Sequence, residues 1–199
     1  MSSKNSLKVP HVKQNSESGC GAAVLFMVYK YYGLDHQTEE KIWARLKKLR
    51  KLNNSEEIIY SYDLYKDIRS NGFHTIIGQA IWQEPEKVIK LLEEFLRIRV
   101  PLIVCQRLRE DKPLGHYKIV IGLEKDFVLV NDPEFEEDFV KVPKDKFIKD
   151  WQKYSDEIIG GQFIAALDEK QIKELRELPL IGFEADIKGF VASDFQFLP

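Results

Sequence analysis

The cysteine at position 20 has the surroundings expected of a nucleophile. Cys20 lies between Gly19 and Gly21 and begins an apolar run that predicts a helix over Gly21–Tyr32, closed by Gly33. At a helix N-terminus, unpaired backbone N–H groups and the positive end of the dipole favour the nucleophilic thiolate over the thiol. The glycines should leave the sulfur open to a substrate backbone. Because a cysteine at a helix start is also often a small buried residue, this segment alone does not establish catalysis.

A glutamine lies six residues before that cysteine. The side-chain amide of Gln14 and the backbone N–H of Cys20 are the kinds of donor that stabilise the oxyanion of a tetrahedral intermediate. We therefore expect Gln14 to belong to an oxyanion hole. His11 is close enough in sequence to line the same site.

A second pair of polar residues is separated by sixteen positions, at His116 and Asp132. Between them, the apolar runs Tyr117–Leu123 and Phe127–Asn131 predict a tight antiparallel hairpin. His116 should open one strand and Asp132 should follow the other, so the two side chains are expected to lie side by side. Asp132 would then orient the imidazole and leave its other nitrogen free to exchange a proton with Cys20.

The residues just before this hairpin suggest a substrate groove. Arg107–Leu114 is polar and contains one proline, which predicts a loop bordering the groove. We expect Gly115, which follows it, to contact the substrate together with Gly19 and Gly21. Cys105 ends an apolar run and is expected to be a buried strand residue without a catalytic role.

The elements that must position these residues follow from hydrophobic periodicity. Helices are predicted over Gln37–Lys51, Ser61–Ser70, Pro85–Arg97, Lys144–Lys153 and Asp168–Glu177, and strands over Phe73–Ile77, Val100–Cys105 and Gln162–Leu167 in addition to the hairpin. Helices followed by antiparallel strands indicate an α+β fold, with an N-terminal helical lobe packed on an antiparallel β-sheet. We expect one domain over residues 1–167 and a C-terminal extension, 168–199, packed on or near it.

Composition excludes several other classes. The chain has 199 residues, with 30 basic against 32 acidic side chains, and this near-neutral charge argues against a nucleic-acid partner. Two cysteines and no clustered Cys/His pattern predict neither a disulfide framework nor a metal site. No signal peptide or apolar run long enough to span a bilayer is present, so we expect a cytoplasmic protein without an integral membrane segment. The oligomeric state stays open.

Two charged segments have a simple interpretation. Lys41–Lys51 is a basic amphipathic stretch that would suit an acidic partner or membrane surface, but a solvated helix face packed through its apolar stripe is the expected role. Glu134–Asp138 is acidic and is expected to form a solvated turn.

Taken together, these residues resemble family thirty-nine of the cysteine peptidases, the bacteriocin-processing or double-glycine peptidases. The resemblance covers residues 7–167 and is carried by Val9-Pro10, Gln14, Cys20-Gly21, Tyr31-Tyr32-Gly33, His116, Ile119-Val120-Ile121-Gly122 and Val130-Asn131-Asp132-Pro133. It implies a papain-like α+β fold that hydrolyses peptide bonds through a thioester, with a peptide or protein substrate and no metal or organic cofactor. It also implies that Cys20 is the nucleophile, His116 the general base and acid, Asp132 the orienting residue, and Gln14 part of the oxyanion hole.

The sequence departs from the transporter-linked members, which remove a leader ending in two small residues. It contains no phosphate-binding loop and no membrane span, so a free-standing member is expected, and Gly19 stands where an acidic residue is common. Two alternatives stay open. One is an acyltransferase or transpeptidase using the same triad, and the other is a non-catalytic peptide-binding module.

Overall fold

The computed structural model of the chain describes residues 6–50, 59–80, 84–109, 112–152, 159–177 and 191–192. The helices are α1 (Cys20–Tyr31), α2 (Glu39–Arg50), α3 (Ser61–Ser70), α4 (Pro85–Arg97), α5 (Lys144–Trp151) and α6 (Glu169–Glu177). The strands are β1 (His74–Gln79), β2 (Leu102–Arg109), β3 (Lys112–Leu123), β4 (Phe127–Asn131), β5 (Val140–Pro143), β6 (Gln162–Leu167) and β7 (Val191–Ala192). Within these ranges, no helix combines the length and apolarity that crossing a bilayer requires.

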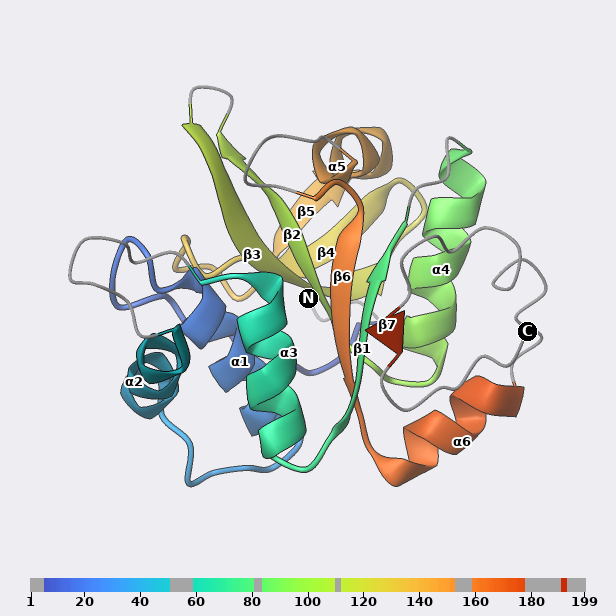
Figure 1. The fold of residues 1–199 in the computed structure, drawn as a ribbon. Helices are drawn as coiled ribbons and strands as arrows, with labels where there is room; N and C mark the ends of the chain where they lie inside the picture. The colour runs from blue at the N-terminus through green and yellow to red at the C-terminus, as the bar shows by residue number, and fades with distance from the viewer. Residues whose placement is uncertain are drawn as a thin grey trace.

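A seven-stranded antiparallel sheet forms the centre of the molecule, in the order β5-β4-β3-β2-β6-β1-β7 (Figure 1). The predicted hairpin is confirmed as β3–β4, in which Ile119 lies opposite Asn131. The register shifts between Val120 and Gly122, which is the signature of a β-bulge and bends the strand. This hairpin carries both polar residues that the sequence analysis paired.

Three helices, α1 to α3, cover one face of the sheet. Helix α1 buries Gly21, Ala22, Ala23, Val24, Leu25, Met27, Val28 and Tyr29. A helix that is apolar nearly all round must be enclosed, and α1 accordingly contacts α2, α3 and β3. Ile42 and Leu46 of α2 are fully buried, so the basic segment packs through its apolar stripe, as expected. Lys51 lies outside the described residues.

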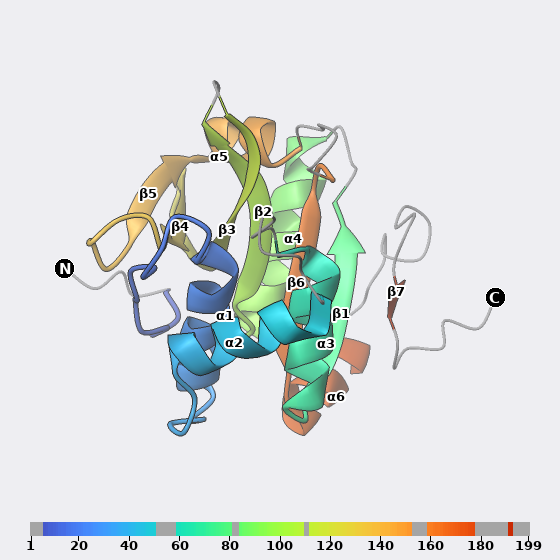
Figure 2. The same ribbon diagram turned by 60° about the vertical axis from the view of Figure 1, so that its left-hand side comes forward.

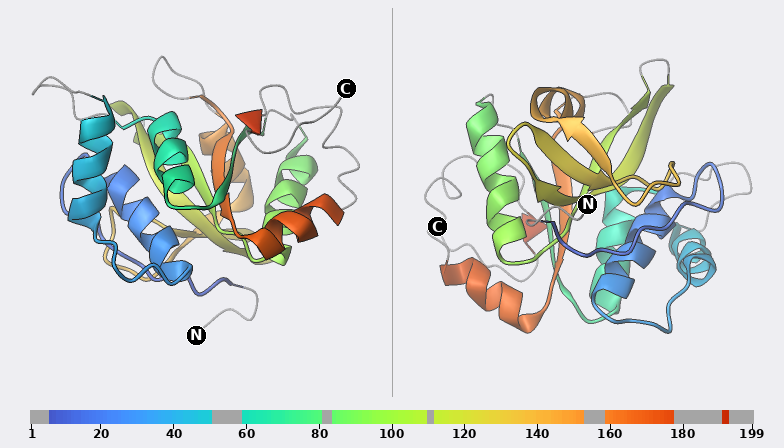
Figure 3. Two further views of the ribbon diagram at one scale, coloured as in Figure 1. Left: turned by 60° about the horizontal axis from the view of Figure 1, so that its bottom comes forward. Right: turned by 180° about the vertical axis from the view of Figure 1, so that it is seen from behind.

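The other helices cover the opposite face, as the view from below in Figure 3 shows. Helix α4 buries Val88, Leu91, Leu92 and Phe95, in one apolar cluster with residues of α5 and α6. The predicted α+β fold is therefore confirmed, but the helical lobe consists of α1 to α3 only. Helix α4 belongs to one apolar cluster and α1 to the other, so the two helices lie on opposite faces of the sheet.

The prediction of a loop over Arg107–Leu114 was wrong. Strand β2 continues to Arg109 and β3 begins at Lys112, with Arg107 paired to Gly115. Backbone hydrogen bonds between two long strands hold this extension, and no alternating apolar pattern marks it in the sequence. His116 consequently lies inside β3 and does not open it. Strands β5 and β7 were also not predicted.

The described part of the C-terminal segment packs on the domain. The Tyr32 hydroxyl donates to Gln171 Oε1 at 3.0 Å, and Gln171 Nε2 donates to the Arg99 carbonyl at 2.9 Å. These bonds attach α6 to the end of α1 and to the turn after α4. The division at residue 167 stays a prediction, and residues 178–190 and 193–199 lie outside the described residues.

Candidate active site

Cys20 is the first residue of α1, as predicted, and its side chain is partly exposed. Gly19 occupies the N-cap position, and Gly33 ends the helix with a φ of 79°, a conformation that glycine adopts without strain. The N–H groups of the first turn have no acceptor within the helix. The thiol therefore lies where the helix dipole favours negative charge.

The loop before Cys20 is held by its own backbone. Ser16 O accepts from Gly19 N at 2.9 Å and from Gln14 Nε2 at 2.8 Å. Gln14 Nε2 also lies 3.2 Å from Glu17 O, while Gln14 Oε1 is buried and has no hydrogen-bond partner. In this structure the Gln14 amide thus shapes the loop that leads to Cys20.

Two of the three glycines expected to contact substrate, Gly19 and Gly21, have close protein neighbours. A Cβ at Gly19 would lie 3.3 Å from Glu39 Oε1, and one at Gly21 would lie 3.3 Å from Ile59 Cγ2. These contacts give a packing reason for small residues on both sides of the cysteine. Gly115 is half-buried in β3. Contact of any of the three with a substrate stays a prediction.

His116 and Asp132 lie side by side, as the hairpin predicted. His116 Nε2 is 2.6 Å from Asp132 Oδ1, and the two side chains are only 4% and 3% exposed. Glu134 N donates to the same oxygen at 3.1 Å, and Lys118 Nζ lies 3.0 Å from the other oxygen, Oδ2. Lys118 is the neighbour that the sequence analysis missed. Its place two residues after His116, on the same side of a strand, was the available signal.

Electrostatics keep this pair charged. Burial disfavours the imidazolium, but hydrogen bonds to Asp132 and to Cys20 outweigh it and raise the pKa of His116 to about 9. Burial also opposes ionisation of Asp132, but the hydrogen bond and charge of His116, followed by the charge of Lys118, lower its pKa to about 2. At neutral pH an imidazolium therefore faces a carboxylate.

Cys20 is close enough to the ring to be one of the causes that raise the pKa of His116, which places the thiol beside the same pair. Because Asp132 occupies Nε2 of the ring, Nδ1 is the nitrogen that remains for Cys20. Cysteine, imidazole and carboxylate thus meet from α1, β3 and the end of β4. The arrangement can pass a proton along the row.

The N-terminal segment, residues 6–14, ties this row together. Leu7 N donates to Ile121 O at 2.7 Å, so the segment runs beside β3 and its neighbour β4 (Figure 2). Further along, His11 Nε2 lies 3.1 Å from Asp132 O, and Gln14 N donates to Pro133 O at 2.8 Å. His11 thus borders the site, and Gln14 is attached by its backbone to the residue after Asp132.

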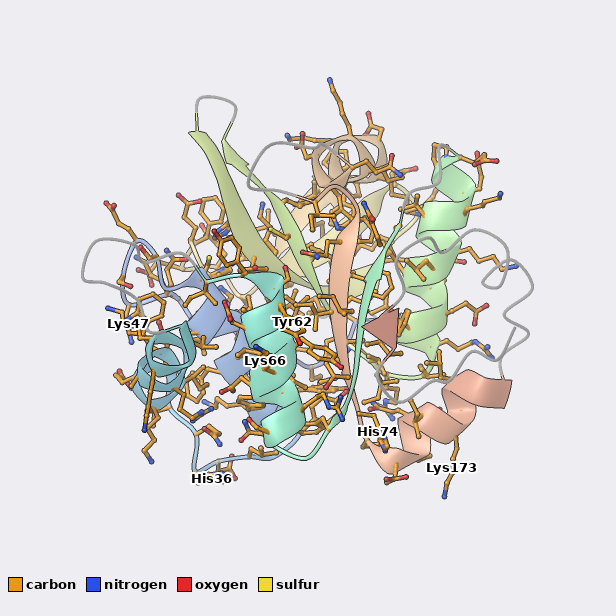
Figure 4. The ribbon with its side chains drawn as sticks, in the orientation of Figure 1. His36, Lys47, Tyr62, Lys66, His74 and Lys173 are labelled. Carbon is orange, nitrogen blue, oxygen red and sulfur yellow. The ribbon has the colours of Figure 1, made fainter. Side chains whose placement is uncertain are left out.

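The other cysteine and two further histidines do not join the row. Cys105 is 7% exposed on β2, and burial, followed by the charge of Cys20, raises its pKa to about 12. His36 follows the end of α1, so it lies at the opposite end of that helix from Cys20, and His74 pairs with Glu169 (Figure 4).

One group of side chains has the composition of a metal site. Single ligand atoms of His116, Asp132 and Glu134 all lie within 4.8 Å of one another. The His116 and Asp132 atoms are, however, bonded to each other, and the ammonium of Lys118 is paired with the same carboxylate. The positive charge of that ammonium opposes a cation at this place.

Comparison with known proteins shows which proteins the chain resembles. A pediocin PA-1 transport/processing ATP-binding protein, PedD, of Pediococcus acidilactici is 24% identical over 142 residues, which are 71% of this chain and 17% of PedD. The chain thus spans about a sixth of that curated relative. A double glycine motif protease from an AMS/PCAT transporter, solved with a leader peptide, superposes with a TM-score of 0.59 at 20% identity, covering 83% of this chain and 96% of that one.

The peptidase domain of Streptococcus ComA, a bifunctional ABC transporter, gives the same TM-score of 0.59 at 23% identity, covering 80% of this chain and 99% of that one. At these identities the solved structures establish the fold. The model of the Peptidase C39 family matches residues 8–155, which include Gln14, Cys20, His116 and Asp132. The chain therefore belongs to the Peptidase C39 family of papain-like cysteine peptidases.

Proposed function

We propose that the chain hydrolyses peptide bonds with Cys20 as nucleophile, His116 as general acid and base, and Asp132 as the residue that orients His116. The observation that carries the proposal is the buried pair in which Asp132 holds one ring nitrogen of His116 at 2.6 Å, together with Cys20, whose interaction with the same ring helps to raise its pKa. A histidine held between a carboxylate and a helix-terminal cysteine is arranged for proton transfer to and from sulfur.

The reaction would proceed in two halves. The Cys20 sulfur, its proton held on His116, attacks the carbonyl carbon of the scissile bond, and the carbonyl electron pair moves to oxygen. As the oxyanion collapses, the C–N bond breaks and His116 gives its proton to the departing amine, which leaves a thioester. The neutral ring then takes a proton from water, whose oxygen attacks the thioester. Release of the acid returns the sulfur and the protonated ring.

Asp132 would serve the first half by keeping the ring in place. Since it binds Nε2, the ring presents Nδ1 to the sulfur in every cycle. The ion pair stabilises the protonated ring, which must persist until the amine leaves. The pKa of about 9 leaves His116 protonated at neutral pH and able to act as the acid.

The oxyanion hole would combine the backbone N–H of Cys20 with the amide of Gln14. Gln14 Nε2 has two N–H groups and contacts two adjacent carbonyls of its own loop, so one N–H must turn toward the substrate as the oxyanion forms. Gln14→Ala should lower kcat about 10²-fold with little change in KM, as expected for a donor used only in the transition state. Gln14→Asn, with a shorter side chain, tests whether reach matters.

The substrate would be a peptide or protein. Support comes from family membership and from the double glycine motif protease that was solved with a leader peptide. Processing of a leader peptide is the corresponding specific role. Peptides with varied residues on the acyl side of the cleaved bond would define the preference.

Labelling with iodoacetamide at neutral pH tests the nucleophile without requiring a known substrate. We expect mass spectrometry to show Cys20 modified much faster than Cys105, whose pKa of about 12 keeps it a buried thiol. Cys20→Ala should abolish peptide turnover, and the matched variant Cys105→Ala should retain it.

The outcomes separate the three possible roles. Equal slow labelling of both cysteines, with no cleavage, would favour a peptide-binding module. Fast labelling of Cys20 with products that contain an added amine would indicate acyl transfer. Fast labelling with free acid products supports hydrolysis.

A further inference from the structure

Lys118 is a lysine inside the sheet whose side chain ends at the site. It lies two residues after His116 on β3, so both side chains leave the strand on the same side. Its Nζ is 3.0 Å from Asp132 Oδ2, and its side chain is only 17% exposed. Enclosing a lysine to this degree costs hydration and side-chain freedom, which a lysine on the open surface keeps.

With this contact, both oxygens of the Asp132 carboxylate have a partner. Oδ1 accepts from His116 Nε2 at 2.6 Å and from Glu134 N at 3.1 Å, while Oδ2 pairs with Lys118. Donors on both oxygens fix the plane of the carboxylate. Without Lys118, one oxygen of a side chain that is 3% exposed would lose its charged partner.

Charge balance gives the second argument. The groups that face the His116 ring are Cys20 from α1 and Asp132 with Glu134 from the segment after β4. Cys105 of β2 meets only the His116 backbone, and His11 of the N-terminal segment reaches the Asp132 carbonyl. The imidazolium carries one positive charge, while Asp132 and Glu134 place two carboxyl groups beside it. The ammonium of Lys118 offsets the charge of the buried one, Asp132.

We propose that Lys118 is a positioning residue, which fixes the second oxygen of Asp132 and offsets its charge so that the His116 imidazolium remains a competent acid. The inference rests on the proposed peptidase function. An unpaired carboxylate would hold the ring proton more tightly, and a proton held more tightly is transferred less readily to a leaving amine.

The test compares Lys118→Met, which keeps the apolar stem and removes the charge, with Lys118→Arg, which keeps the charge. Lys141→Met is the matched control, because Lys141 is a strand lysine paired with Glu124 at 2.7 Å, on β5. Three quantities are measured for each full-length variant: the His116 ring titration by NMR, the pH dependence of Cys20 alkylation, and the alkaline limb of kcat/KM.

Lys118→Met should raise the midpoint of the His116 titration, and the pH of the alkaline limb, by about one pKa unit. That is the scale expected for removing a charge on the far side of the Asp132 carboxylate at an effective dielectric of 20 to 80. Its kcat at neutral pH should fall roughly threefold to tenfold with KM unchanged. Lys118→Arg and Lys141→Met should titrate as the parent protein does.

Two results would overturn the proposal: a His116 titration unchanged in Lys118→Met, or an equal shift in Lys118→Arg. If Lys118→Met melts before titration, Lys118→Gln provides a second uncharged variant with a smaller desolvation cost. The NMR and alkylation measurements need no substrate. A parent protein that cleaves no peptide would therefore end the proposed function, while the titrations would still decide the role of Lys118.

Discussion

Replacing Asp132 with Asn should remove a pH-dependent part of the folding free energy. The Asp132 side chain is 3% exposed and lies 2.6 Å from His116, so solvent screens the pair weakly. The hydrogen bonds of His116 to Asp132 and Cys20 raise its pKa from 6.5 to about 9 against the effect of burial. In the unfolded chain both partners regain their ordinary values.

The sign follows from proton binding. Between pH 6.5 and pH 9 the native state holds a proton on His116 that the unfolded state has lost, so stability falls as pH rises through this window. At about 1.4 kcal/mol per pH unit, the loss over the window is about 3 kcal/mol. At the acid end, the pKa of Asp132 is lowered from 3.8 to about 2, so stability is lost again as pH falls through that range. Both shifts describe one ion pair and are not added.

Urea unfolding, followed by tryptophan fluorescence at several pH values from 6.5 to 9, measures the effect. Asp132→Asn should be less stable by about 3 kcal/mol at the acid end of this window and should lose most of the slope. Glu169→Gln is the matched control, because it uncouples an exposed His–carboxylate pair, with Glu169 78% exposed, and should change stability by less than about 1 kcal/mol. A variant that kept the parent slope would show that the His116 proton does not depend on Asp132, and the electrostatic account of the site would fail.

Three further substitutions test the packing that supports the site, each measured by urea unfolding. Gly161→Ala should cost more than about 2 kcal/mol, because Gly161 has a φ of 74° and a Cβ there would lie 2.1 Å from Ala80 O. Asp67→Asn should cost about 2 kcal/mol, because Asp67 is 1% exposed and its carboxylate pairs with Arg45 Nε at 2.9 Å, a charged partner that asparagine does not supply. Phe147→Ala should cost about 4 kcal/mol, since Phe147 is fully buried between α5 and the sheet.

Local sequence patterns were sufficient to predict the bounds of those helices and strands whose own residues mark where they begin and end. Helix α3 has the predicted bounds Ser61–Ser70, and α4 has the predicted bounds Pro85–Arg97, because a cap region, a proline at the first turn and a steady apolar period mark them. Strands β4 and β6 also match, because short apolar runs between turn residues leave little choice of register. Cys20 at the start of α1 belongs to the same class.

Features that depend on partners far along the chain were not predictable in this way. The sequence predicts helix α4 correctly, but its period does not say which face of the sheet it covers. That choice depends on packing partners far along the chain, such as Phe163 of β6, whose ring contacts Phe95 of α4. The extension of β2 and β3 past Cys105 likewise depends on pairing between two polar strands, which has no signature in either strand alone.

The candidate site combines both kinds of information. His116 and Asp132 are brought together by one hairpin whose strands are joined by a short turn. Because this contact is local in sequence, it could be predicted. The backbone after β4 depends instead on the N-terminal segment, since Asn131 Nδ2 donates to Val9 O at 3.0 Å across 122 positions of sequence. Residues 9–14 therefore bond to the residues on both sides of Asp132 and also carry the glutamine that precedes the nucleophile. One short segment thus sets the distance between the carboxylate end of the row and the loop of Cys20, so a change in its backbone should move both ends of the site together.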